Sequence, residues 1–294
     1  MDCDSFLPQT LHWGGGCKYR LINTCPLDNL ITIFHLSVLN GSNIMAALAE
    51  SNHEPEVSLH RTLSALLCGK ADLAKDHWVE YLVGQGAVAA VGDTINLYGG
   101  EYERFLIFLR KAFQRKCVST CENSKFCPSV SVTKPLCDIS LSKDQPIKTQ
   151  IEACFDDYFT ECRETYNVTL PPEIARQFSE RSRVYNIETK KYDAVRVCNG
   201  IRSYTQIQLP ENCWFIPMEL SQWEPGVIPE FPLEIGICGR TFHCRGFTCS
   251  SSNHFTACVR HKDSWIHYDG MKSPELTADF KENIGKPNYA IYTI

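Results

Sequence analysis

The chain has 294 residues, of which 44% are hydrophobic and 21% charged, and its formal net charge is -5 at pH 7. The apolar fraction is too high for a disordered chain, and the mildly acidic balance disfavours a general nucleic-acid binder, which needs a basic surface. The apolar stretches are much shorter than the roughly 20 residues of a membrane-spanning helix. We therefore expect a globular protein that binds neither nucleic acid nor membranes.

The sixteen cysteines are the unusual feature of the composition. Cysteine-rich disulfide scaffolds are usually short and secreted, and the first residues show neither the basic nor the apolar segment of a signal peptide. We therefore expect an intracellular protein of the nucleus or cytoplasm, with thiols that are mostly reduced. In that setting cysteines serve as small buried hydrophobes, as zinc ligands or as a nucleophile.

Helices are predicted mainly in the first half of the chain. Apolar residues recur at helical spacing over residues 25–39, which predicts a buried helix with Thr24 as its cap and Pro26 in its first turn. Similar patterns predict further helices over 59–68, 71–83, 101–113 and 147–159.

Strands are predicted mainly in the last third, after a segment rich in Cys, Ser and Pro at 117–144. Their patterns cover 194–198, 204–209, 213–220, 233–238, 241–249, 255–260, 264–268 and 289–293. Helices in the first half and strands in the last third indicate the α+β class rather than alternating βα units.

Cys25 is the candidate nucleophile. It lies at the start of a predicted helix, where the helix dipole and free amide groups favour a thiolate and can hold a developing oxyanion. No other cysteine in the sequence fits this description as well. The alternative interpretation is a small core residue that happens to begin a helix.

A catalytic thiol needs a base, and His254 is the candidate because Asp269 can orient it. Residues 254–269 are predicted to form two strands joined by a tight turn, with His254 at the start of the first strand and Asp269 at the end of the second. These two ends are neighbours in an antiparallel hairpin, so the carboxylate can select the imidazole tautomer. The alternative is two unrelated surface residues that flank a hairpin.

These three residues and their surroundings resemble the Cys, His and Asp boxes of the ubiquitin-specific-peptidase-like cysteine proteases. Other segments similar to that family follow in its order: a thumb helix at 100–113, a segment before the second finger cysteines at 140–159, a Leu-Pro strand from 209 and a closing strand at 289–293.

The resemblance implies an α+β, papain-like cysteine protease fold of the ubiquitin-specific peptidase type, with a helical thumb, reduced fingers and a β-rich palm. It implies a single catalytic domain over 1–294. The thumb-like part would be 1–116, the fingers-like insertion 117–212 and the palm 213–294.

Within that superfamily the chain is most similar to the divergent SUMO-isopeptidase branch. The sequence Cys25-Pro26-Leu27-Asp28 resembles the Cys-x-x-Asp motif of that branch, where most ubiquitin-specific peptidases have Asn. The sequence Asn253-His254-Phe255 resembles its Asn-His-Phe motif, where the others usually have Gly-His-Tyr.

The oxyanion donor departs from the family pattern. Arg20 occupies the position, five residues before the nucleophile, where the family usually has an Asn, and Asn23 matches a different Asn of the motif. We expect the backbone amide of Cys25 to serve, helped by Asn23 or another polar side chain. Arg20 either contributes or is a solvated surface charge.

The middle cysteines Cys117, Cys121, Cys127 and Cys198 are candidate ligands of a structural zinc ion, which takes four thiolate or imidazole ligands. The resembled family often carries two Cys-x-x-Cys knuckles in its fingers, but this sequence has no Cys-x-x-Cys. The alternative is a finger that has lost its metal and retains some cysteines as core residues.

The resemblance implies a thiol-dependent isopeptidase that cleaves ubiquitin or SUMO after its C-terminal Gly-Gly from lysine conjugates, with SUMO slightly favoured. No cofactor is needed for this catalysis, and the expected partners are the modifier tail and the conjugated proteins. The alternatives are a catalytically inert modifier-binding module of the same fold and a ubiquitin-specific deubiquitinase without SUMO activity. A zinc-dependent interaction domain is a further alternative, supported by the middle cysteines alone.

Overall fold

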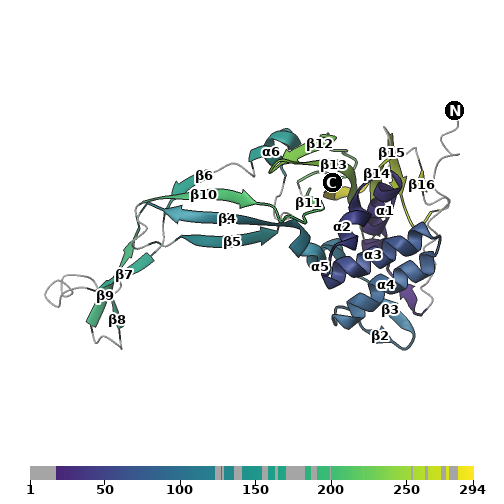
Figure 1. Cartoon of the computed structure of the whole chain (residues 1–294), viewed down its shortest axis with the longest axis horizontal. Helices are drawn as coiled ribbons and strands as arrows, with labels where there is room; N and C mark the ends of the chain where they lie inside the picture. Colours follow the sequence, from purple (N-terminus) through teal and green to yellow (C-terminus); the bar gives the residue numbers. More distant parts are fainter. Residues whose placement is uncertain are drawn as a thin grey trace. The chain divides into compact units, whose positions relative to one another are not determined.

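The chain combines helices with mostly antiparallel sheets, and the α+β class predicted from the sequence is confirmed (Figure 1). The computed structural model divides into two compact units, the first made of Met1–Gln114, Pro135–Cys154 and Leu209–Ile294, the second of Arg115–Lys134 and Phe155–Gln208. The described residues are 18–122, 127, 129–135, 141–153, 158–162, 165–169, 183–186, 191–198, 200–220, 222–252, 254–261, 264–272, 276–277 and 284–294.

The helices of the first unit agree in part with the prediction. They are α1 (Cys25–Leu39), α2 (Ile44–Ala49), α3 (Glu54–Leu67), α4 (Ala71–Gly84), a π-helical turn (Tyr102–Leu106), α5 (Ile107–Leu109), a 3₁₀ turn (Arg110–Phe113) and α6 (Ile147–Ala153). The predicted helix over 147–159 is wrong in its second part, because Tyr158–Glu161 form strand β6. Aromatic and β-branched residues at 158–160 favour that extended conformation. Of the helices described, none is long and apolar enough to cross a membrane.

Helix α1 is the central helix of the first unit, and twelve of its fifteen residues are buried. It packs against strands β13 (Arg240–Ser251) and β14 (His254–His261) (Figure 1). Gly246 on β13 permits this close approach, because a Cβ there would lie 2.7 Å from the Cys258 carbonyl oxygen and 3.1 Å from Ile33 of α1. The helix that begins with Cys25 is therefore held firmly on the sheet.

The predicted cap position of α1 is confirmed, because Thr24 is its N-cap residue, but the Thr24 side chain does not cap the helix. Thr24 has α-helical dihedral angles, and its hydroxyl donates to Asp28 Oδ2 at 2.6 Å instead of accepting from a backbone amide. The carbonyl oxygen of Thr24 does begin the helix, since it accepts from the N–H groups of Leu27 and Asp28.

The main sheet of the first unit has the strand order β11-β17-β13-β14-β15-β16, with β12 paired to β13. Every pairing in it is antiparallel. The remaining strands are β11 (Phe215–Glu219), β12 (Glu234–Ile237), β15 (Ser264–Tyr268), β16 (Leu276–Thr277) and β17 (Lys286–Thr293). A smaller sheet, β1-β3-β2, places β1 (Arg20–Ile22) parallel to β3 (Thr94–Asn96), with β2 at Ala90–Val91.

Two antiparallel sheets make up the second unit. The first has the order β5-β4-β10-β6 and the second β7-β9-β8. Their strands are β4 (Gln114–Cys121), β5 (Val130–Pro135), β6 (Tyr158–Glu161), β7 (Thr165–Thr169), β8 (Arg183–Asn186), β9 (Lys191–Val197) and β10 (Ile201–Gln208). Most of this unit lies within the segment 117–212 that the sequence assigns to fingers, but Pro135–Cys154 fold with the first unit.

Candidate active site

The first unit brings the candidate nucleophile and the candidate base to one cavity of about 470 Å³. Cys25 is the first residue of α1 and is half-buried, and His254 is the first residue of β14. Both line the cavity, and Asp269 follows directly after β15. Asn253, the residue before the histidine, lies outside the described residues.

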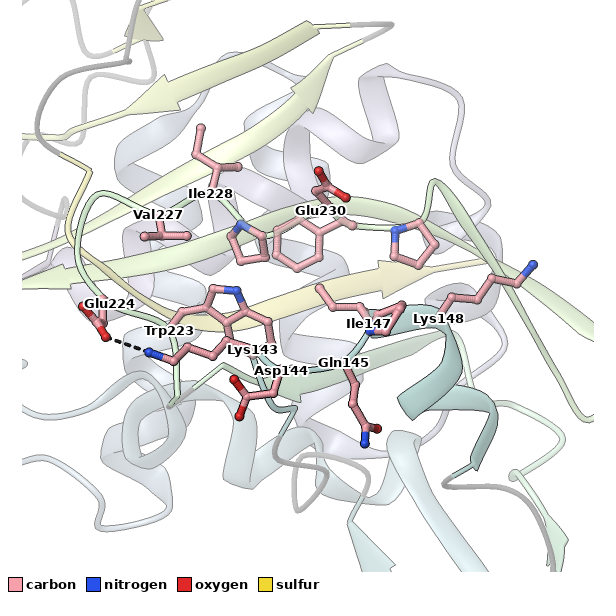
Figure 2. Close-up of a pocket in the computed structure, with 14 residues that line it drawn as sticks. Lys143, Asp144, Gln145, Ile147, Lys148, Trp223, Glu224, Val227, Ile228 and Glu230 are labelled. Atoms are coloured by element: carbon pink, nitrogen blue, oxygen red, sulfur yellow. Dashed lines mark hydrogen bonds and ion pairs between the residues drawn. The ribbon is translucent and has the colours of Figure 1, made fainter.

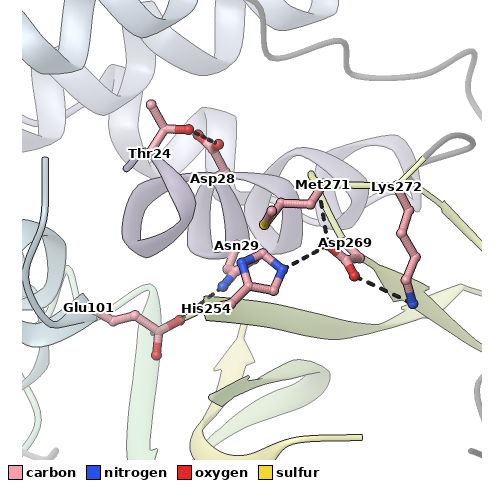
Figure 3. A network of polar contacts seen from close by, with 8 residues as sticks. All are labelled: Thr24, Asp28, Asn29, Glu101, His254, Asp269, Met271 and Lys272. Atoms are coloured by element: carbon pink, nitrogen blue, oxygen red, sulfur yellow. Dashed lines mark hydrogen bonds and ion pairs between the residues drawn. The ribbon is translucent and has the colours of Figure 1, made fainter. Parts of the chain in front are cut away.

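His254 and Asp269 form a close pair, with 2.8 Å between Nε2 and Oδ1 (Figure 3). The Met271 N–H also donates to Oδ1 at 3.0 Å, and Lys272 Nζ lies 3.5 Å from Oδ2. Burial alone raises the pKa of Asp269, but the Met271 amide, His254 and Lys272 together bring this pKa below its ordinary value. An ionised carboxylate accepts the proton on Nε2, so the Nδ1 atom of His254 is left as the base.

The Cys25 thiol is less acidic than its place at a helix start suggests. Burial raises its pKa, and the negative charges of Asp28 and Glu101 add to this effect. A backbone hydrogen bond from Phe255 acts in the opposite direction. The helix start favours the thiolate, but desolvation disfavours the charged form more strongly, so the net shift of the Cys25 pKa is upward. This thiol needs a base to remove its proton.

The first turn of α1 offers a backbone donor beside the thiol. The N–H groups of Leu27 and Asp28 already donate to the Thr24 carbonyl oxygen, and Pro26 has no N–H. The Cys25 N–H remains as the first-turn amide next to Sγ. It can therefore stabilise negative charge on an oxygen atom held close to the thiol.

The two residues predicted to support the oxyanion are placed differently. Asn23 lines the cavity and has a φ of 56°, in the left-handed region that asparagine tolerates. Its side-chain amide donates to Asn96 Oδ1 at 2.9 Å, which leaves one of its two N–H bonds for another acceptor. Arg20 is exposed on β1 and falls outside the set of described residues that line the cavity.

A larger cavity, of about 830 Å³, lies between the segment before α6 and residues 223–232 (Figure 2). Its wall includes Trp223, Phe231 and an ion pair of 2.8 Å between Lys143 and Glu224. Among the described residues that line it there is neither a cysteine nor a histidine. The cavity of about 470 Å³ is therefore the candidate active site, because both a nucleophile and a base line it.

A second chemical feature is a buried group of four cysteines in the second unit. The Sγ atoms of Cys121, Cys127, Cys162 and Cys198 all lie within 4.8 Å of one another. Cys121 and Cys198 are 3.7 Å apart, and Cys127 and Cys162 are 3.8 Å apart. Tetrahedral zinc with bonds of about 2.3 Å requires sulfur atoms about 3.8 Å apart, so this donor set fits zinc.

The predicted ligand set needs one correction, since Cys162 takes the place given to Cys117. Cys117 and Cys121 both lie on strand β4, four residues apart, which separates their Cα atoms by about 13 Å. Two ligands of one ion cannot be that far apart on an extended strand. The side chain of Cys117 lies outside the described part of the structure. No sequence spacing pointed to Cys162, because it approaches Cys127 only through the folding of the unit.

Sequence reasoning also missed Glu101, a buried carboxyl group near the candidate active site. Asn29, Thr248 and Asn288 donate hydrogen bonds to it from three different elements. The pattern at 101–113 predicted a helix, and nothing in the sequence marked this carboxyl as buried.

Comparison with known proteins yields little. No family model matches the chain, and no curated protein matches its sequence. A solved structure described as the Saccharomyces cerevisiae PAN2 pseudoubiquitin-hydrolase is similar, with a TM-score of 0.43 and 11% identity over 100% of this chain and 90% of that chain. Similarity at this level establishes neither a shared fold nor a shared function.

Proposed function

We propose that the chain is a cysteine isopeptidase that cleaves a ubiquitin-family modifier after its C-terminal Gly-Gly from lysine conjugates, on a papain-like fold of the ubiquitin-specific peptidase type. The observation that carries this proposal is that Cys25 and His254 line one cavity. The Oδ1 atom of Asp269 lies 2.8 Å from His254 Nε2. The same three residues carry the resemblance to that family in the sequence.

The proposed reaction begins when His254 Nδ1 takes the proton of the Cys25 thiol. The Sγ atom then attacks the glycyl carbonyl carbon, and the Cys25 N–H stabilises the oxyanion. His254 returns the proton to the departing lysine amine, which leaves a thioester on Cys25. His254 next removes a proton from water, the hydroxide adds to the thioester, and the thiol regains its proton as the modifier leaves. Asp269 keeps the imidazole oriented and stabilises its charged form.

Two features bear on the identity of the modifier. The Cys25-Pro-Leu-Asp28 sequence and the segment around His254 are those that resemble the SUMO-isopeptidase branch. Asp28 also lines the cavity, and its Oδ2 atom accepts a hydrogen bond from the Thr24 hydroxyl at 2.6 Å. We propose SUMO as the preferred modifier and ubiquitin as the alternative.

A catalytically inert modifier-binding module is the second candidate. The raised pKa of the Cys25 thiol favours it, as does Arg20 at the position where the resembled family usually has an oxyanion Asn. The intact set of nucleophile, base and orienting carboxylate argues against it, because binding alone needs none of the three.

Ubiquitin and SUMO that carry a C-terminal electrophile separate these candidates. We expect a covalent adduct with the wild-type chain and none with Cys25→Ala. Cys68→Ala is the matched control, since Cys68 is an exposed cysteine outside the cavity and its loss should leave adduct formation unchanged. Binding of both modifiers without any adduct would support the inert module and contradict the enzyme.

We also propose a structural zinc ion on Cys121, Cys127, Cys162 and Cys198. Burial, with the neighbouring Cys198 and Cys162 thiol groups, raises the pKa of Cys127 to about 12, so without a metal this thiol stays neutral. Bound zinc would supply the positive charge that allows thiolate ligands. The ion would crosslink the strands of the second unit and takes no part in the proposed reaction.

A further inference from the structure

Glu101 is a fully buried carboxyl group that joins three elements of the first unit. Its Oε2 accepts from Thr248 Oγ1 on β13 at 2.7 Å and from Asn288 Nδ2 on β17 at 3.4 Å. Its Oε1 accepts from Asn29 Nδ2 on α1 at 3.4 Å. Figure 3 shows this hydrogen bond between Asn29 and Glu101, and Asn29 lines the same cavity as His254. One carboxyl group thus links the helix of the candidate nucleophile to two strands of the main sheet.

The hydrogen-bond partners of Glu101 are close neighbours of both candidate catalytic residues. Asn29 lies four residues after Cys25, so the two side chains share one face of α1, one turn apart. On the sheet side, Asn288 accepts from the Ser250 hydroxyl at 3.0 Å, and Ser250 pairs with Phe255, the residue after His254. Glu101 is therefore connected, through hydrogen bonds and chain neighbours, to both sides of the cavity.

Glu101 changes its charge state near neutral pH. Burial raises its pKa to about 7, against the lowering effect of the hydrogen bonds from Thr248, Asn29 and Asn288. When ionised, it raises the pKa of two thiols that face it, Cys25 from α1 and Cys249 from β13. Among the described residues, other charged or titratable groups line the two adjoining cavities. Asp28 and His254 line the candidate active site, and Glu103, Glu219 and Lys286 line a neighbouring cavity of about 500 Å³.

Asn29 can form a hydrogen bond with Glu101 whether the carboxyl group is ionised or protonated. Its Nδ2 donates to the carboxylate, whereas its buried Oδ1 has no hydrogen-bond partner among the described residues. If Glu101 is protonated, a rotation of the Asn29 amide by half a turn places Oδ1 where the new O–H can donate to it. The unsatisfied oxygen is thus a ready acceptor for the neutral acid.

We propose that Glu101 is a positioning residue that holds the helix of Cys25 against the sheet of His254 and, when ionised, disfavours the Cys25 thiolate. The inference rests on the proposed role of Cys25 as the nucleophile, but it concerns a property of the resting thiol. It can therefore be tested without any modifier.

The test is the rate at which a small haloacetamide alkylates Cys25, followed by mass spectrometry of the Cys25 peptide from about pH 5.5 to about pH 8.5. Glu101→Gln retains the shape of the side chain and imitates the protonated acid. We expect equal rates in the two proteins below about pH 6, and a rate about threefold higher in the variant above pH 8, with a midpoint near pH 7. Glu103→Gln, two residues along and exposed, is the matched control and should show no such midpoint.

A ratio of the two rates that stays constant with pH, in a Glu101→Gln protein that is folded by circular dichroism, would overturn the proposal. If that variant does not fold, the alkylation profile of Thr248→Val tests the proposal instead. It removes the 2.7 Å donor to the carboxylate, so the midpoint in its alkylation profile should move to higher pH. A midpoint that does not move in Thr248→Val contradicts the proposal. Absence of adducts with the modifier probes would contradict the proposed function and leave this measurement intact.

Discussion

His254 and Asp269 lie fifteen residues apart in the sequence, yet their Nε2 and Oδ1 atoms are 2.8 Å apart. The antiparallel pairing of β14 with β15, with Ala257 opposite Tyr268, brings the two ends of the hairpin together. The turn that leads into β14 includes Ser252 with a φ of 54°, which directs the chain sharply back toward the cavity. The base is thus positioned by local hairpin geometry, whereas the nucleophile arrives from a distant helix.

Replacement of Asp269 by Asn should reduce kcat/KM on a modifier–fluorophore conjugate by about 100-fold or more, because the imidazole loses the carboxylate that selects its tautomer. The measurement is steady-state kinetics at neutral pH. Asp144→Asn, an exposed aspartate at the other cavity, is the control and should retain full activity. Equal activity of Asp269→Asn and the wild type would exclude Asp269 from the proposed role.

Glu101 should make the folded state less stable as the pH rises. Its pKa is about 7 in the folded state and near 4.5 when unfolded, so the folded state holds its proton more tightly. Its stabilising contribution is therefore fully present below pH 4.5 and is lost as the pH rises through 7, by about 3 kcal/mol. Chemical denaturation at several pH values should show this loss in the wild type and not in Glu101→Gln. Parallel pH profiles for the two proteins would contradict it.

Zinc content should distinguish Cys162 from Cys117. We expect about one zinc ion per chain in the wild type and in Cys117→Ser, and loss of the ion in Cys162→Ser, because tetrahedral zinc needs all four thiolates. Metal analysis of the purified proteins gives the content, and proteolysis after treatment with a chelator reports on the second unit. Wild-type protein without zinc would end the metal proposal, and zinc loss in Cys117→Ser alone would restore the ligand set first predicted.

Gly246→Ala should destabilise the first unit by about 2 kcal/mol, since the added methyl group overpacks the contact between α1 and β13. A Cβ there would lie 2.7 Å from a carbonyl oxygen on β14. Gly236→Ala on β12 is the control, because a Cβ there meets nothing within 4 Å. Thermal unfolding of the two variants gives the comparison, and equal melting temperatures would show that the sheet can shift to accommodate the methyl group.

Local patterns in the sequence were sufficient for much of the fold. Helical spacing located α1 and α4 closely, and alternation located most strands of the main sheet. Local patterns misled at Cys238 and at 147–159. The strand predicted over 233–238 ends at Ile237, and Cys238 is exposed in a turn with a φ of 50°. Of the predicted helix over 147–159, the described residues form helix α6 at Ile147–Ala153 but strand from Tyr158 onward, where β6 pairs with β10.

The candidate site also has properties that the sequence could predict and others that it could not. Cys25, His254 and Asp269 could be chosen from the sequence because a helix start and a hairpin are local features with recognisable spacing. The raised pKa of the Cys25 thiol could not, because it depends on burial and on the charges of Asp28 and Glu101 around the folded cavity. The sequence by itself therefore determined which side chains carry the proposed chemistry. Only the tertiary structure decided the acidity of the thiol, the fourth cysteine at Cys162 and the buried carboxyl of Glu101, since each depends on contacts between residues that lie far apart along the chain.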